Sequence, residues 1–190
     1  MFRDFHQYWT ASPFNNCQPK TMTFAVRLAL ETDAPALIAL RRRLFEETSF
    51  MLWEPAEFTN TEDDERARIV RLGQQSNSLV LVAEAETQLV GLLSATGGER
   101  NQLRHSALLS LGVARSHWSQ GIATRMIQEV IAWSLAAGLK RLELTVHTTN
   151  LRAVSVYLRH GFLVEGMRRS SLLVDGKYVD EYFMSLIHGS

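Results

Sequence analysis

The sequence has few of the features that mark disulfide-bonded, membrane-spanning or strongly charged proteins. It contains one cysteine, Cys17, which excludes a disulfide within the chain and is typical of a reducing compartment. No apolar run approaches the roughly 20 residues that a membrane-spanning helix needs. Lys plus Arg and Asp plus Glu number 20 each, so no net charge attracts nucleic acid or an anionic membrane. We expect a soluble, cytoplasmic protein without nucleic-acid or membrane partners.

Two common phosphate-binding motifs are also missing. The chain has no Gly-x-x-x-x-Gly-Lys-Ser/Thr, and no Gly-x-Gly-x-x-Gly opens a helix. We expect no metal site. A length of 190 residues suits one domain with a sizeable core and would be cramped for two.

Residues 1–22 differ in composition from the rest of the chain. They lack the apolar core and small-residue cleavage site of a secretion signal. Aromatic residues are interleaved with polar ones without a helix or strand period: Phe2, Phe5, Tyr8, Trp9 and Phe14. We take 1–22 as a mobile N-terminal extension, or a segment translated upstream of Met22, and 23–190 as the domain. In the alternative interpretation the aromatic residues dock on the domain or on a partner subunit.

The hydrophobic pattern from Thr23 onward predicts seven strands and four helices. The expected strands are 24–28, 79–86, 89–95, 103–113, 141–148, 162–174 and 178–187. The expected helices begin after Thr32 or Asp33, after Thr61, near Ile122 and after Asn150, and the last two end at Gly138 and Gly161. Asp175-Gly176 is a favoured two-residue hairpin loop. The fold class is α/β (α+β layered), with a mixed, mostly antiparallel sheet.

The most informative stretch runs from Leu108 to Met126. Its apolar beginning is typical of a strand buried on both faces, and Ile122, Met126, Val130 and Trp133 then recur with helical spacing. A strand, a tight turn and a helix leave main-chain N–H groups unpaired at the helix start. Together with the helix dipole, they can bind an anion such as a pyrophosphate.

A second motif, Asn150-Leu151-Arg152-Ala153-Val154-Ser155-Val156-Tyr157-Leu158-Arg159-His160-Gly161-Phe162, follows downstream. With Trp118-Ser119-Gln120-Gly121-Ile122-Ala123, it resembles the GCN5-related N-acetyltransferase (GNAT) family. That family's pyrophosphate loop is Gln/Arg-x-x-Gly-x-Gly/Ala, and its later signature is Asn-x-x-Ala-x-x-x-Tyr-x-x-x-Gly-Phe. The later signature matches at every fixed position, while Trp118 stands where Gln or Arg is commoner. The resemblance covers roughly residues 23–188.

The resemblance implies the same fold, with acetyl-CoA as co-substrate. The acyl-pantetheine arm would lie between the strands 103–113 and 141–148, which run parallel and splay apart in the family. The implied cofactor-binding residues are Leu111, Val113, Trp118, Ser119, Gln120, Gly121, Ile122, Ala123, Thr124, Asn150 and Tyr157. Gly121 would allow the phosphate to come close to the main chain, where a Cβ would hold it off.

The implied activity is acyl transfer from a thioester to a primary amine by direct attack. An alkylamine with a pKa near ~10.4 must first lose a proton. Tyr157 matches the family tyrosine beside the sulfur and is our candidate general acid. Alternatively, Tyr157 only packs in the core. A covalent route through Cys17 is not expected, because no activating partner is evident in the sequence.

The sequence leaves the general base open. Many relatives carry a Glu on the central strand, where this chain offers Ser110 and no carboxylate. The candidates are Glu47, Glu54, Glu84, His105, His147 and Asp180. Each also has an ordinary structural role as its alternative, and a chain of waters could serve instead.

The C-terminal stretch from Val164 to Met184 resembles the bacterial branch that acts on small amines. We therefore favour a small-molecule or amino-acid acceptor, because the aromatic residues at 50–58 suit an apolar side chain and no acidic groove is evident. The alternatives are a ribosomal-protein or other protein N-terminal acetyltransferase and a non-catalytic acyl-CoA sensor. The terminal hairpin has an open edge through which we expect a homodimer.

Overall fold

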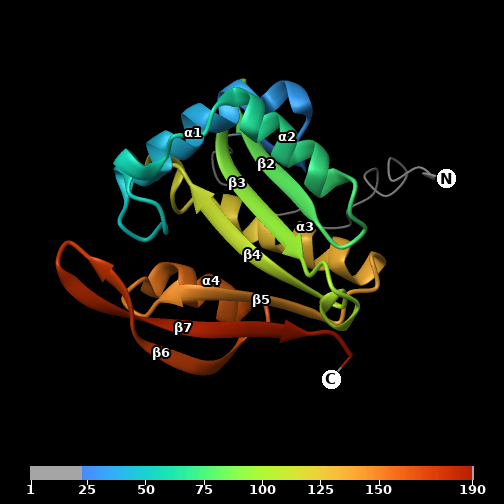
Figure 1. Ribbon diagram of the computed structural model, residues 1–190, viewed down its shortest axis with the longest axis vertical. Helices are drawn as coiled ribbons and strands as arrows, with labels where there is room; N and C mark the ends of the chain where they lie inside the picture. The colour runs from blue at the N-terminus through green and yellow to red at the C-terminus, as the bar shows by residue number, and fades with distance from the viewer. Residues whose placement is uncertain (1–22, 190) are drawn as a thin grey trace.

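The predicted strands form one seven-stranded sheet in the computed structural model, which describes residues 23–189 (Figure 1). The strand order is β1-β2-β3-β4-β5-β7-β6, and every neighbouring pair is antiparallel except β4 and β5. The strands are β1 (Phe24–Leu28), β2 (Leu79–Ala85), β3 (Gln88–Gly97), β4 (Ser106–Val113), β5 (Arg141–His147), β6 (Leu163–Val174) and β7 (Lys177–Ile187). The predicted fold class is confirmed.

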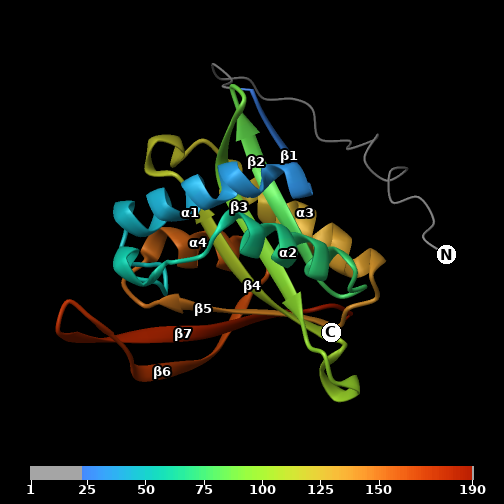
Figure 2. The same ribbon diagram turned by 45° about the horizontal axis from the view of Figure 1, so that its top comes forward.

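Four α-helices cover the two faces of the sheet (Figures 1 and 2). They are α1 (Ala34–Glu47), α2 (Glu62–Gly73), α3 (Ile122–Ala136) and α4 (Leu151–Arg159). Helices α1 and α2 bury their apolar side chains on one face, and α3 and α4 bury theirs on the other. The Thr61 hydroxyl accepts a hydrogen bond from the Asp64 N–H, and this capping box begins α2.

The structure changes two details of the sequence prediction. The central strand was expected from Leu103, but 101–103 form a 3₁₀ turn and β4 begins at Ser106. Leu103 is apolar yet half exposed, so its hydrophobicity was misleading. Asp33 precedes α1 without capping it, because its carboxylate accepts hydrogen bonds from the Leu30 N–H and the Arg27 guanidinium instead.

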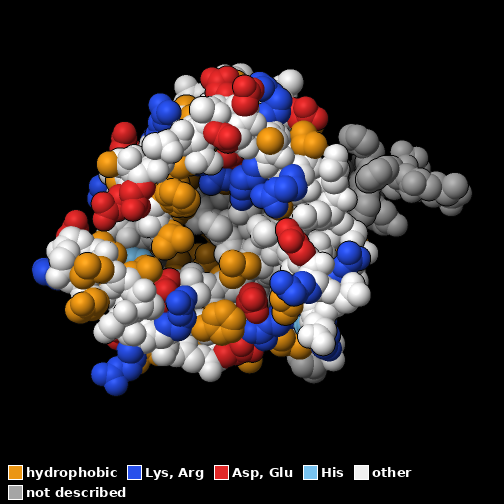
Figure 3. All heavy atoms as spheres, viewed as in Figure 1, with side chains coloured by type: hydrophobic (Ala, Val, Ile, Leu, Met, Phe, Trp, Pro, Cys, Tyr) orange, Lys and Arg blue, Asp and Glu red, His pale blue; other side chains and the backbone are white. Residues whose placement is uncertain are grey.

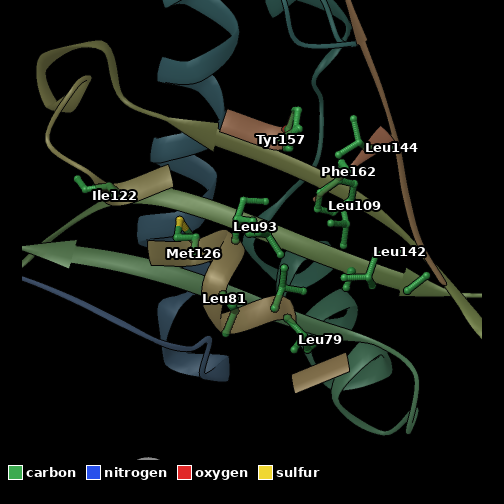
Figure 4. Packing of buried hydrophobic residues seen from close by; sticks show 14 of the residues in the cluster. Leu79, Leu81, Leu93, Leu109, Ile122, Met126, Leu142, Leu144, Tyr157 and Phe162 are labelled. Atoms are coloured by element: carbon green, nitrogen blue, oxygen red, sulfur yellow. The ribbon is translucent and has the colours of Figure 1, made fainter. Parts of the chain in front are cut away.

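The larger core lies between the sheet and the helices α3 and α4. Its side chains include Ile122 and Met126 from α3, Leu142 and Leu144 from β5, and Phe162 after α4, all at most 1% exposed (Figure 4). Burial of each such side chain contributes about 1.5–3 kcal/mol. This core fixes α3 and α4 against β4 and β5, the two strands that border the candidate site.

Two further features are absent from the described residues, a membrane-spanning helix and a cluster of metal ligands. No helix within 23–189 is long and apolar enough to cross a membrane. The same residues bring no three His, Cys, Asp or Glu side chains together in a way that could hold a metal ion. The predictions for the N-terminal extension, including Cys17, lie outside the described residues.

Candidate active site

The parallel strands β4 and β5 pair over only a short length and then diverge. Residues 106–108 of β4 pair with 141–143 of β5. Beyond these three pairs, β4 continues to Val113 and β5 continues to His147 without pairing with each other. The result is a gap that begins after Leu108 and opens toward the ends of both strands.

Main-chain groups of β4 face this gap. The Ala114 N–H donates to the Val90 carbonyl at 2.8 Å, and the Gly98 N–H donates to the Ser106 carbonyl at 3.3 Å. In an antiparallel ladder the bonded residues alternate. The even-numbered residues of β4 therefore bond to β3, and Leu111 and Val113 turn their main-chain groups toward β5, as a pantetheine arm would require.

The turn after β4 presents a row of unpaired amides. Gly121 immediately precedes α3 with φ +84°, and Ser119 has φ +63°. None of the main-chain N–H groups from Ser119 to Thr124 donates a hydrogen bond to another residue in the described part of the chain. Open space surrounds Gly121, where an added Cβ would find no atom within 4 Å. Six consecutive donors and the positive end of α3 make this turn suitable for a pyrophosphate.

Trp118, which departs from the family pattern, contacts both β4 and α4 beside this turn. Its indole Nε1–H donates to the Val113 carbonyl at 2.7 Å. The guanidinium carbons of Arg115 and Arg152 lie 5.7 Å and 4.9 Å from its ring centroid. Arg152 also donates to the Ser119 hydroxyl at 3.2 Å. Two cations therefore flank the unpaired amides.

Neither arginine was predicted as a site residue. Arg152 lies in the first turn of α4, more than thirty positions from the turn it contacts. Sequence spacing alone gives no signal for a contact of this kind, although Arg152 is part of the quoted second motif.

The second motif holds Asn150 and Tyr157 on α4. The Asn150 side chain accepts a hydrogen bond from the Ala153 N–H at 3.2 Å, so it caps the helix as expected. Tyr157 is 7% exposed and belongs to the same cluster as Leu109 of β4 and Leu144 of β5 (Figure 4). Burial raises the pKa of Tyr157 to about 12. The phenol therefore stays protonated at neutral pH.

The opposite face of β4 lies open beside the gap. Leu108 is 50% exposed and Ser110 is exposed, because α1 and α2 do not extend over this part of the sheet. Figure 3 shows the molecule hollowed here, between the side that carries α1 and α2 and the side that carries β5 and β7. The loop after α1 reaches across, and the Phe50 ring lies 5.4 Å from the His147 ring.

Most candidate bases lie away from this hollow or are engaged elsewhere. Glu47 accepts hydrogen bonds from the Arg115 N–H and from Arg43. Burial acts to raise the pKa of Glu47, but these bonds together lower it. Glu84 pairs with Arg27 beside the edge strand β1.

The other three candidates are exposed or hydrogen-bonded elsewhere. Glu54 is exposed in the loop between α1 and α2. His105 is exposed at the paired end of β4 and β5, where its carbonyl accepts from the N–H groups of Lys140 and Arg141. Asp180 accepts from the Ser170 N–H at 2.7 Å. Only His147 is buried at the open end of the gap.

An arginine cluster lies between α1 and α2. Glu65 is fully buried and accepts from Arg41 at 3.0 and 3.2 Å, and Arg68 lies 3.4 Å away. Burial and repulsion by Arg41 and Arg71 lower the pKa of Arg68 to about 10, although Glu65 opposes the shift. The Glu65 carboxylate therefore pairs with two guanidinium groups, those of Arg41 and Arg68, and Arg71 adds a third positive charge close to Arg68. Lys and Arg side chains gather along the upper rim of the hollow in Figure 3.

Comparisons with known proteins agree with this geometry. A model of the acetyltransferase (GNAT) family matches residues 39–162. The chain is 31% identical to the L-amino acid N-acetyltransferase AaaT of Escherichia coli over 62% of this chain and 73% of that protein. It is 29% identical to the spermidine N(1)-acetyltransferase of Vibrio cholerae, over 53% of this chain and 57% of that protein.

Solved structures show the same fold. A GNAT-family acetyltransferase from Streptococcus pneumoniae superposes with a TM-score of 0.85 at 28% identity, covering 87% of this chain and 99% of that one. The yncA protein of Salmonella typhimurium, solved with its cofactor acetyl-CoA, superposes with a TM-score of 0.78 at 19% identity, covering 88% of this chain and 96% of that one.

Proposed function

Because the chain belongs to the acetyltransferase (GNAT) family and is an acyl-CoA-dependent acetyltransferase, we propose that it transfers acetyl from acetyl-CoA to a primary amine by direct attack. The observation that carries the proposal is the row of six unpaired amides beside a gap lined by main-chain groups of β4. Phosphates and a peptide-like arm are the ligands that such donors suit.

The residues present can hold the cofactor. The N–H groups from Ser119 to Thr124 would bind the pyrophosphate, with Arg115 and Arg152 supplying positive charge beside them. Main-chain groups of Leu111 and Val113 would pair with the pantetheine amides. The Val113 carbonyl already accepts from Trp118, so its N–H is the group left for the cofactor.

Tyr157 is the proposed general acid. The bound thioester supplies the acetyl group and a thiolate leaving group. The phenol holds a proton throughout the neutral range, because its burial raises its pKa to about 12. It would donate this proton toward the sulfur and regain one that the amine loses.

We favour an amino acid or another small molecule with an anionic group as the acceptor. The arginine cluster of Arg41, Arg68 and Arg71 offers guanidinium charge in excess of its one carboxylate, Glu65. We propose that these guanidinium groups face the acceptor, where their charge would attract a carboxylate and repel a polyamine. The similarity to an L-amino acid N-acetyltransferase supports the same choice, and a protein N-terminus is the second candidate.

We further propose a cytoplasmic homodimer that forms through the C-terminal hairpin. The edge strand β6 exposes Leu163, Val164 and Met167, and an apolar edge of this kind suits pairing with a second copy. Light scattering of the purified chain would test the dimer directly.

Calorimetric titration with acetyl-CoA followed by a thiol-release assay over amines tests the activity. The panel should contain L-amino acids, the matching amines without a carboxylate, spermidine and a peptide with a free N-terminus. We expect binding and preferential release with the L-amino acids. Binding without release on any amine would favour an acyl-CoA sensor, and preference for the peptide would favour the protein N-terminal activity.

A further inference from the structure

A buried histidine and a buried glutamate lie side by side at the open end of the gap. His147 is the last residue of β5, and Glu181 is its direct partner on β7. The Thr148 N–H bonds to the Asp180 carbonyl, so His147 and Glu181 form a non-hydrogen-bonded pair of the antiparallel ladder. In such pairs the Cα atoms are about 4.5 Å apart and the side chains leave the same face of the sheet.

Both side chains of the pair are enclosed, and hydrogen bonds hold the Glu181 carboxylate beside the imidazole. His147 is 5% exposed and Glu181 is 6% exposed. The Glu181 carboxylate accepts from the Ser171 hydroxyl at 2.8 Å and lies 3.4 Å from Arg168. Phe50 meets the imidazole edge to face, at an angle of 88° between the ring planes. The remaining element at this point, the start of α4, contributes the uncharged Asn150, whose N–H bonds to the His147 carbonyl.

The charges on the pair follow from these contacts. Burial lowers the pKa of His147 from its ordinary value of 6.5, and Glu181 opposes this shift without overcoming it. The imidazole is therefore neutral at pH 7 and has a free lone pair. Once it takes a proton, the neighbouring carboxylate stabilises the imidazolium.

We propose that His147 is the general base that removes the proton from the acceptor ammonium, directly or through one water, and that Glu181 is its positioning residue. The inference rests on the proposed acetyl transfer. It places the base on β5, because the central strand β4 carries no carboxylate and has Ser110 at its centre. The sequence alone could not select His147, since its partner Glu181 is brought beside it only by the order of the strands.

The proton balance is complete without a further reactant. The acceptor ammonium and the acetyl thioester give an amide, a thiol and one proton. One C–N bond forms and one C–S bond breaks. The nitrogen loses two protons: one goes to His147 and then to solvent, and the other replaces the proton that Tyr157 gives to the sulfur.

The test uses His147→Gln in the full chain, with an L-amino acid acceptor that the wild type turns over. We expect kcat/KM at pH 7 to fall by roughly 10²–10⁴-fold. The variant should recover about tenfold per pH unit as the pH rises, because free amine then forms without a base. Acetyl-CoA affinity, measured by calorimetry, should stay within about twofold. Imidazole should restore activity to His147→Ala, which would exclude misfolding as the cause.

Glu181→Gln gives a readout that a structural role would not move. The wild-type rate should decrease as the pH falls through a midpoint below 6.5. Removing the Glu181 carboxylate should shift that midpoint to still lower pH, because the carboxylate favours the imidazolium. His105→Gln, which changes an exposed histidine at the paired end of the strands, should leave the profile unchanged.

Two results would overturn the proposal in distinguishable ways. If His147→Gln keeps the wild-type rate and pH profile, another group is the base, and the acetyltransferase proposal stands. If the wild-type protein binds acetyl-CoA but releases thiol with no amine, both proposals fail together.

Discussion

Replacing Gly121 with Ala separates backbone strain from loss of the phosphate site. Gly121 has φ +84° directly before α3, and its surroundings leave room for a methyl group. An L-residue in this conformation costs about 1–2 kcal/mol, partly offset by about 0.4–1 kcal/mol from the stiffer unfolded chain. We therefore expect Gly121→Ala to lower the free energy of unfolding by about 1 kcal/mol without a steric clash.

The same substitution should affect cofactor binding more strongly than stability. The added methyl group would project from the row of free amides and hold a phosphate away from them. Losing one or two charge-assisted hydrogen bonds of about 1.5–3 kcal/mol each corresponds to at least a tenfold rise in the Kd for acetyl-CoA. Denaturant unfolding and calorimetric titration measure the two quantities separately.

Gly176 provides a matched control for this experiment. It has φ +73° in the loop between β6 and β7, and an added Cβ there also meets no atom within 4 Å. Gly176→Ala should therefore cost similar stability and leave the Kd for acetyl-CoA unchanged. Equal Kd values for the wild type and Gly121→Ala would refute the phosphate role of this turn.

Three further substitutions test the proposed binding and acid groups. Tyr157→Phe should lower kcat at least roughly 10²-fold and spare acetyl-CoA affinity, whereas unchanged turnover would exclude the acid role. Arg152→Ala should raise the Kd for acetyl-CoA about five- to thirtyfold by calorimetry, while Arg159→Ala on the same helix should not. Arg68→Gln should raise the KM for an L-amino acid about tenfold and leave that of the matching amine without a carboxylate unchanged, and a similar rise for both acceptors would contradict the carboxylate role.

The element order could be predicted from the sequence because its signals are local. Apolar spacing at Ile122, Met126 and Val130 is set within one helix, and the cap at Asn150 involves residues three apart. The start of β4 was less predictable, because an exposed Leu103 in a turn looks like a strand residue. Boundaries of this kind depend on which apolar residues the neighbouring elements cover.

The candidate site could be predicted only where a known motif matched. The phosphate turn and Tyr157 came from such motifs and remain predictions about binding and chemistry. The contacts of Arg152 with Trp118, and of His147 with Glu181, join segments that are distant in the chain. The first depends on how α4 packs beside the turn after β4. The second depends on the strand order, in which β7 lies between β5 and β6, and no local pattern encodes either arrangement.

The divergence of β4 from β5 has a consequence for how the enzyme can change during evolution. In the proposed binding mode, the ligand pairs with main-chain groups of β4 that no strand occupies. Such groups are peptide groups, which every amino acid supplies. The side chains that leave the open face of β4, such as Leu108 and Ser110, are then free to vary without loss of the shared donor molecule. In the proposed binding mode, new acceptors could therefore be acquired by surface substitutions, while the acetyl source stays the same.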